Sequence, residues 1–321
     1  MRYTRLGQTG PVISNIGLGS LALTGAYGHV DNAEALSLIR KALDAGVTLI
    51  DTAGFYAAGQ VERLVGRAVA GRAHEVVVCT RGGVRRARPG RPTRFDGRLD
   101  YLERSCESSL ERLGIDSLDL YYLHCQDERV PVEASMARLS RLVTAGKIRY
   151  VGLSNGTPQQ LRRAHAVHPV TAVAVEYSLW GLRAQPALLT AARQMGITVV
   201  AARPLGRGFL TSRIRSPVQL GPGDWRHEDP RFQPENLRLS VGPLREVEAA
   251  AAQLDVGAGR LALGWLLSQG DHIVPVPSTR DPVHLEMNLA ASAVELAPAT
   301  RDRLARIFPA VRFDQSPSLL L

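Results

Sequence analysis

The 321-residue sequence has few cysteines, almost no lysine and no long apolar run. No apolar stretch approaches the ~18 residues that cross a bilayer as a helix, so we expect no membrane association. The three cysteines, Cys79, Cys106 and Cys125, lack the spacing of metal sites and redox motifs, so we expect no bound metal and a cytoplasmic location. The first residues, MRYTR, lead into a turn rather than an apolar segment, and we expect no secretory signal peptide.

Lysine is so scarce that Lys41 and Lys147 are the only two among 39 basic residues. This skew toward arginine indicates a compositional bias of the source genome. The net charge of +9 is spread along the chain without a nucleic-acid motif, so we expect no nucleic-acid partner. Seven arginines cluster between residues 81 and 98. A solvated loop is the simpler interpretation of this cluster, and attraction of an acidic substrate or a carrier-linked phosphate is the alternative.

Short β-branched runs alternate with amphipathic stretches, which is typical of parallel βα units. Near-continuous apolar runs such as ITVVAA predict strands that are buried on both faces, with helices outside. Strands are predicted at residues 16–20, 47–53, 75–81, 118–124, 148–154, 171–178, 197–204 and 272–278. Helices are predicted at residues 32–45, 61–70, 99–113, 132–145, 158–168, 185–195, 244–254 with 259–268, and 282–291.

Eight strand–helix repeats favour an α/β fold of the (β/α)8 TIM-barrel type, formed by one domain over residues 1–321. No GxGxxG follows the first strand, which argues against a doubly wound dinucleotide-binding sheet. Residues 1–14 predict an N-terminal β-hairpin that turns at residues 8–10. Residues 206–240 are too long for an ordinary connection after the seventh strand, and they predict a long loop that folds over one face as a flap.

Polar side chains stand where the predicted strands end. In a (β/α)8 barrel the carboxyl ends of the strands meet at one mouth, where the active site lies. Each residue alone could be structural, but their convergence predicts an active site. The residues are Asp51, Arg81, His124, Ser154, Asn155, Glu176, Arg203, Ser278, Thr279 and Arg280.

Seven motifs follow one another along the chain: YTRLGQTGPVISNIGLG, LIDTAGFY, SLERLGIDSLDLYYLH, GKIRYVGLSN, EYSLW, PLGRGFLT and IVPVPSTR. They resemble those of the aldo-keto reductases, which are NAD(P)H-dependent enzymes on a (β/α)8 barrel. PLGRGFLT followed by GDWRHEDPRFQPEN is similar to a bacterial and plant-type subgroup. In this family hydride passes from the nicotinamide to a substrate carbonyl, and a tyrosine delivers the proton.

The resemblance implies a catalytic set of Asp51, Tyr56 and His124, with Arg81 standing where the family has lysine. A phenol of pKa about 10 can protonate an alkoxide when its neighbours make the anion accessible, and His124 would orient the carbonyl. Arginine keeps the positive charge of lysine. Its planar fork, however, can bind Asp51 through two nitrogens, which is a different geometry from that of a compact ammonium.

The resemblance also implies NADPH as the cofactor. Arg280 would pair with the adenosine 2′-phosphate. Ser154 and Asn155 would hold the carboxamide, and a loop would cover the phosphates. Beyond these the implied cofactor-binding residues are Leu205, Gly206, Gly208, Ser278, Thr279 and Asn288.

Several positions depart from the family pattern. Ala174 replaces a glutamine that binds the carboxamide, and Ala202 replaces an aromatic residue that stacks on the nicotinamide. Gly54 and Ala57 change the motif around the tyrosine.

Three functions therefore stay open. The first is an NADPH-dependent reductase of a small aldehyde or ketone with an atypical Asp/Tyr/Arg/His tetrad. The second is non-redox acid–base chemistry, a dehydration or cyclisation, in which Arg81 and Arg203 bind an anionic group. The third is a catalytically impaired NADP(H)-binding protein. Substrate identity and oligomeric state are left open.

Overall fold

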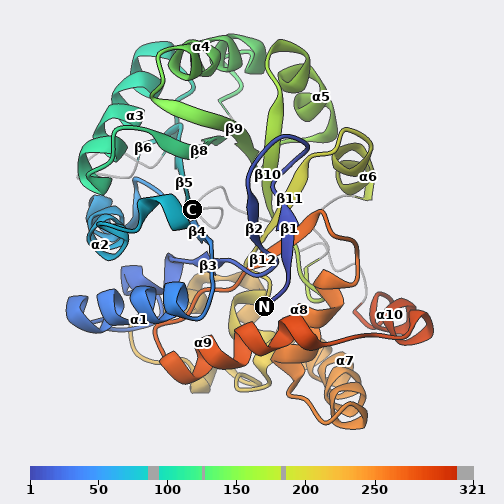
Figure 1. Cartoon of the computed structure of the whole chain (residues 1–321). Coiled ribbons are helices and arrows are strands. Elements are labelled where there is room, and N and C mark those ends of the chain that lie inside the picture. Colours follow the sequence, from blue (N-terminus) through green and yellow to red (C-terminus); the bar gives the residue numbers. More distant parts are fainter. Residues whose placement is uncertain (86–93, 125–126, 182–185, 309–321) are drawn as a thin grey trace.

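Parallel strands form a closed barrel in the computed structural model, which describes residues 1–85, 94–124, 127–181 and 186–308 (Figure 1). Within these residues the barrel sheet has eight strands in chain order around the ring. They are β3 (Leu18–Gly19), β4 (Leu49–Asp51), β5 (Val77–Gly82), β8 (Leu118–His124), β9 (Ile148–Ser154), β10 (Val170–Glu176), β11 (Thr198–Ala202) and β12 (Ile273–Val276). The first and last strands meet because the N–H groups of Gly17 and Gly19 donate to the carbonyls of Pro275 and Pro277 at 3.0 Å.

Helices surround the barrel and cover its outer face (Figure 1). They are α1 (Asn32–Asp44), α2 (Gln60–Val69), α3 (Leu99–Leu113), α4 (Val132–Thr144), α5 (Pro158–Val167), α6 (Pro186–Gln194), α7 (Pro234–Gln253), α8 (Ala258–Leu267), α9 (Pro282–Leu289) and α10 (Pro298–Leu304). Capping side chains mark the start of two of these helices. Asp31 accepts from the N–H groups of Ala33 and Glu34 at the start of α1, and Thr157 forms a capping box with Gln160 at the start of α5. Every residue of β5 and β10 is buried, as expected for a parallel sheet between two layers. The (β/α)8 prediction is confirmed.

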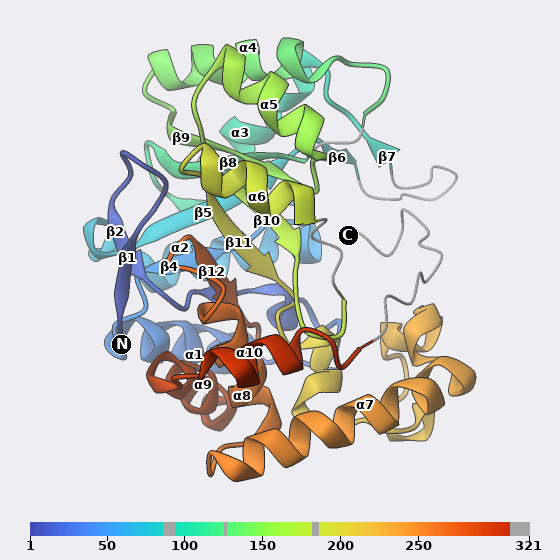
Figure 2. The ribbon, with the colours of Figure 1, turned by 90° about the vertical axis from the view of Figure 1, so that its right-hand side faces the viewer.

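The predicted N-terminal hairpin is present as β1 (Tyr3–Arg5) paired with β2 (Val12–Ser14). Its backbone N–H groups at Gly7 and Ser14 donate to Thr198 and Thr48, both at 2.7 Å. These threonines stand at the amino ends of β11 and β4, so the hairpin closes that end of the barrel. Figure 2 shows the hairpin on the left and the short strands β6 (Val84–Arg85) and β7 (Arg94–Phe95) on the right, at the opposite end.

The segment after β11 differs from the prediction. Helix α7 begins at Pro234 instead of residue 244 and continues through Pro243. The buried face of Leu237, Ser240 and Leu244 is unbroken across this proline, so packing outweighs the one lost hydrogen bond. The preceding segment is not a plain loop, because it folds into short 3₁₀ turns at Gly206–Thr211, Pro217–Gln219, Trp225–Glu228 and Pro230–Phe232. Helix α10 had no counterpart among the predicted helices.

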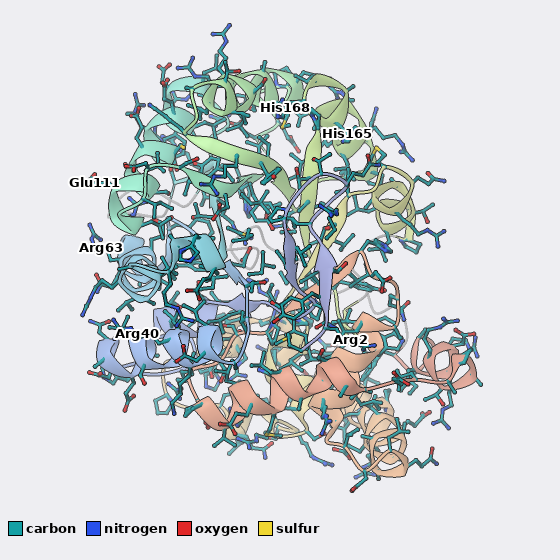
Figure 3. The ribbon with its side chains drawn as sticks, in the orientation of Figure 1. Arg2, Arg40, Arg63, Glu111, His165 and His168 are labelled. Atoms are coloured by element: carbon teal, nitrogen blue, oxygen red, sulfur yellow. The ribbon has the colours of Figure 1, made fainter. Side chains whose placement is uncertain are left out.

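Charged side chains on the outer helices point away from the barrel. Figure 3 shows Arg40, Arg63 and Glu111, from α1, α2 and α3, at the edge of the molecule. Along the described part of the chain, no helix combines the length and apolarity needed to cross a bilayer.

Candidate active site

A cavity of about 380 Å³ opens at the carboxyl ends of the strands, opposite the hairpin. Most of the predicted site residues line it, which places them together although they come from distant parts of the sequence. They are Asp51, Tyr56, Arg81, Ser154, Asn155, Leu205, Gly208, Ser278, Thr279, Arg280 and Asn288. His124 and Gly206 lie beside the cavity rather than in its wall. A Cβ on Gly206, whose φ is +57°, would lie 3.1 Å from the indole of Trp180, so the turn packs closely against that ring.

Arg81, on β5, crosses the base of the cavity. Its Nη2 donates to Oδ1 of Asp51, its Nη1 donates to Oγ of Ser154 at 3.2 Å, and its Nε donates to the carbonyl of Thr52 at 3.3 Å. The two-nitrogen contact with Asp51 that an arginine can form is not made here, because the other two nitrogens bind different oxygens. Oδ2 of Asp51 has no hydrogen-bond partner within the described residues.

Asp51 and Arg81 are both nearly inaccessible to solvent, with side chains 7% exposed. Burial raises the pKa of Asp51, and the adjacent guanidinium opposes this shift. The two side chains form a buried ion pair.

Tyr56 lies in the turn that follows β4. Its N–H donates to the carbonyl of Ala53 at 3.0 Å. Ala57 and Ala58 after it have φ values of 45° and 53°. A left-handed conformation is costly for residues other than glycine, and consecutive examples are characteristic of functional loops. Burial raises the pKa of Tyr56 above 10, although the positive charge of Arg81 lowers it, so the phenol is neutral.

His124 ends β8 between aromatic rings. Phe95 stacks on it with centroids 5.3 Å apart, and Phe55 contacts it edge-on at 6.2 Å. Nδ2 of Asn155 lies 3.5 Å from Nε2 of the imidazole. Burial, followed by the charges of Arg81 and Arg203, lowers the pKa of His124 to about 3. The imidazole is therefore uncharged at neutral pH.

The segment after β12 forms a further part of the cavity wall. Nη1 of Arg280 donates to the carbonyl of His29 at 2.7 Å, and Ser278 accepts from the N–H of Ala22 at 2.6 Å. Thr279 accepts from the N–H of Asp281 at 3.0 Å. These contacts hold a cation and two hydroxyl groups in the cavity wall.

The cavity wall is rich in arginine. Arg203, Arg207, Arg213, Arg226, Arg260 and Arg280 line the cavity. Ala174 and Ala202 also line the cavity, and their side chains offer neither an amide nor a ring.

Sequence reasoning missed a buried charge network beside the cavity. Glu176, at the end of β10, accepts from Arg203 at 3.2 Å, from Arg207 at 3.0 Å and from Arg231. Asp229 binds both Arg207 and Arg231. The arginines come from a segment without periodicity, so only the abundance of arginine after β11 hinted at such a network.

The arginine-rich segment after β5 is only partly described, because Arg86, Arg88 and Arg91 lie outside the described residues. Of the rest, Arg85 and Arg98 both bind Asp96, at 2.6 Å and 2.9 Å. Arg85 also lies over the ring of Tyr101, 4.4 Å from its centroid. Arg85 and Arg98 are therefore engaged by their own chain, which favours the simpler interpretation as a structural loop.

Comparison with known proteins agrees with this architecture. The family model described as "Aldo/keto reductase family" matches residues 15–307. The chain is 37% identical over 311 residues to "Probable aldo-keto reductase 1" of Glycine max, covering 96% of this chain and 88% of that protein. It is 38% identical over 290 residues to an aldo-keto reductase of Schizosaccharomyces pombe whose name specifies NADP(+), covering 89% and 85%.

Among solved structures, a glycerol dehydrogenase of Gluconobacter oxydans superimposes with a TM-score of 0.87 at 26% identity, covering 98% of each chain. The fold, the extent of the family match and the identity to curated relatives agree with one another. The chain therefore belongs to the aldo/keto reductase family.

Proposed function

We propose that this protein reduces the carbonyl of a small aldehyde or ketone to an alcohol, with NADPH as the reductant. The observation that carries this proposal is that Tyr56, Arg81, Asp51 and Arg280 all line one cavity. A neutral acid and an exposed cation in the wall of one cavity suit a reaction between a carbonyl and a phosphorylated dinucleotide.

The residues along the cavity fit NADPH better at its phosphates than at its nicotinamide. Guanidinium groups and the Ser278 and Thr279 hydroxyls are the donors that phosphate oxygens require. Arg280 would bind the 2′-phosphate, and Leu205, Gly206 and Gly208 would cover the pyrophosphate. Ser154 and Asn155 would hold the carboxamide without help from Ala174. NADPH, when bound, supplies the hydride for the reduction.

In the proposed mechanism the chain positions and protonates the carbonyl oxygen. Tyr56 is the general acid, since its raised pKa keeps the phenol protonated until charge develops on the oxygen. Arg81 places a positive charge near the phenol and stabilises the phenolate that forms after proton transfer. Asp51 holds Arg81 in place. His124, which is uncharged and lies beside the cavity wall, would orient the carbonyl oxygen through one ring N–H.

The test is a screen of aldehydes and ketones in which consumption of NADPH and formation of alcohol are both measured. We expect turnover with part of the panel and a loss of at least about 100-fold in Tyr56→Phe, because general-acid catalysis contributes 10²–10⁴-fold. Tight NADPH binding without reduction of any carbonyl would reject the proposal. Product formation without net change in the nicotinamide would instead support the acid–base alternative.

A further inference from the structure

Both ends of the turn that carries Tyr56 pack against one side chain of helix α3, that of Arg112. A Cβ on Gly54 would lie 2.9 Å from Nη2 of Arg112, and a Cβ on Gly59 would overlap the Cδ atom of the same arginine. Arg112 belongs to the last turn of α3 and is 18% exposed. The turn of residues 54–59 therefore lies directly against the Arg112 side chain.

Arg112 is itself held by a carboxylate that is fully buried. Its Nε donates to Oε2 of Glu62 at 2.5 Å, and Glu62 is 0% exposed. The other oxygen of Glu62, Oε1, accepts from the hydroxyl of Thr80 at 2.6 Å. Both carboxylate oxygens are thus satisfied, as a buried charge requires. This arrangement leaves Arg112 little freedom to move.

Thr80 connects this outer cluster to the site inside the barrel. Successive side chains on a strand point to opposite faces, so Thr80 faces α2 and α3 whereas Arg81, the next residue of β5, faces the cavity. The chain of contacts runs from Thr80 through Glu62 to Arg112 and then to the turn. It links the strand that carries Arg81 with the turn that carries Tyr56.

The turn needs such support because its own backbone is unfavourable. Ala57 and Ala58 both have left-handed φ values, which cost free energy that the surrounding structure must offset. Gly59, with φ +87°, has no side chain to keep Arg112 away.

We propose that Arg112 is a positioning residue for Tyr56: held by buried Glu62, it supports the turn of residues 54–59 from outside the barrel and so sets the distance between the phenol and Arg81. This inference rests on the proposed role of Tyr56 as the general acid. Arg112 does not line the cavity, so its effect is on the turnover step rather than on binding.

The experiment compares Arg112→Met, Arg112→Lys and a matched control, Arg63→Met. Arg63 is the residue after Glu62, and it is exposed at the outer edge of α2 (Figure 3). We expect Arg112→Met to lower kcat by about 10- to 100-fold, because a displacement of about 1 Å has this effect. We expect the KM for the carbonyl and the Kd for NADPH to change by less than about twofold. Arg112→Lys restores part of kcat, and Arg63→Met leaves it unchanged.

Hydrogen exchange provides a readout that does not depend on activity. We expect the amides of residues 54–59 to exchange about tenfold faster in Arg112→Met, with β9 unaffected. Equal exchange in Arg112→Met and Arg63→Met, or faster exchange without loss of kcat, would overturn the inference. If the wild-type protein reduces no carbonyl, the proposed function fails. Faster exchange would then still support the contact between Arg112 and the turn.

Thr80→Val tests the same chain of contacts if Arg112→Met folds poorly. This change keeps the volume of the side chain and removes the hydrogen bond to Glu62. We expect kcat to fall about threefold, exchange at residues 54–59 to rise and the Tm to fall by a few degrees, because one buried oxygen of Glu62 loses its partner. An unchanged kcat and exchange rate in a folded Thr80→Val variant would count against the inference.

Discussion

Arg81 reaches Asp51 through a single nitrogen, Nη2, while its other two nitrogens bind the Ser154 hydroxyl and the Thr52 carbonyl. The positive charge that stands near Tyr56 is therefore spread over a planar group anchored at three points. A lysine at this position would place its charge on one atom. This difference bears directly on how easily Tyr56 gives up its proton.

Arg81→Lys is expected to increase carbonyl reduction. An ammonium group lowers the pKa of the phenol more effectively than a delocalised guanidinium, and a lower pKa makes Tyr56 a better acid. We expect kcat to rise about tenfold, which corresponds to about 1.4 kcal/mol of activation free energy. Steady-state kinetics with a substrate from the screen measures this effect.

The control is Arg81→Met, which removes the charge and should lower kcat below the wild-type value. A gain in Arg81→Met would show that the charge is not used. No gain in Arg81→Lys would indicate that Ala174 and Ala202, rather than Arg81, limit turnover.

The barrel and its site were predictable because their signals are local. A β-branched run such as the one ending at Asp51 predicts a buried strand, and the polar residue after it falls at the carboxyl end by the geometry of parallel strands. The placement of Tyr56, Arg81 and Arg280 around one cavity follows from this rule and from the family resemblance. Eight such runs alternating with helical patterns predict the (β/α)8 architecture without reference to tertiary contacts.

The remaining features depend on contacts between residues far apart in sequence. The local sequence does not show that one nitrogen of Arg81 donates to Ser154 instead of to Asp51. It also does not show that the Arg112 side chain packs against Gly59. The start of α7 was misplaced for a related reason, since Pro243 is a local signal for a helix end that tertiary packing overrides. To predict such features, one must know the positions of several helices and strands relative to one another.

The rate of reduction is expected to be independent of pH between about pH 5 and about pH 9. His124, with a pKa of about 3, stays neutral over this range. Burial raises the pKa of Tyr56 above 10, so the acid form is present below that value and is lost as the pH rises through it. A profile of kcat at saturating NADPH measures this dependence. A transition near pH 6.5 would contradict the buried, neutral state of His124.

Arg280→Ala is expected to weaken the binding of NADPH but not that of NADH. The guanidinium lies at the cavity rim, where it would form a charge-assisted contact with the 2′-phosphate. Loss of about 1.5–3 kcal/mol should weaken NADPH binding by about 10- to 100-fold and leave NADH binding unchanged. Calorimetric titration measures both affinities, and Arg63→Ala on the outer face is the control. Equal weakening of both cofactors would assign Arg280 a structural role.

Glu176→Gln is expected to destabilise the fold, because one carboxylate holds the guanidinium groups of Arg203, Arg207 and Arg231. Removing one member of a buried charge network typically costs about 3–5 kcal/mol of unfolding free energy. Glu103→Gln, which breaks a more exposed pair with Arg138, is the control and should cost about 1 kcal/mol or less. Urea unfolding at neutral pH compares the two variants.

The loss of stability in Glu176→Gln is expected to depend on pH, and the direction of this dependence follows from the pKa of Glu176. Burial alone would raise the pKa of this carboxyl, but the three guanidinium groups outweigh burial and hold the pKa well below its usual range. A pKa depressed in the folded state stabilises the protein above the unfolded-state value of about 4.3, and this stability is lost as the pH falls through the folded-state pKa. The difference in unfolding free energy between wild type and Glu176→Gln should therefore be constant from about pH 6 to 8 and become smaller below about pH 4. A difference that widens in acid would mean that Glu176 is protonated in the folded protein.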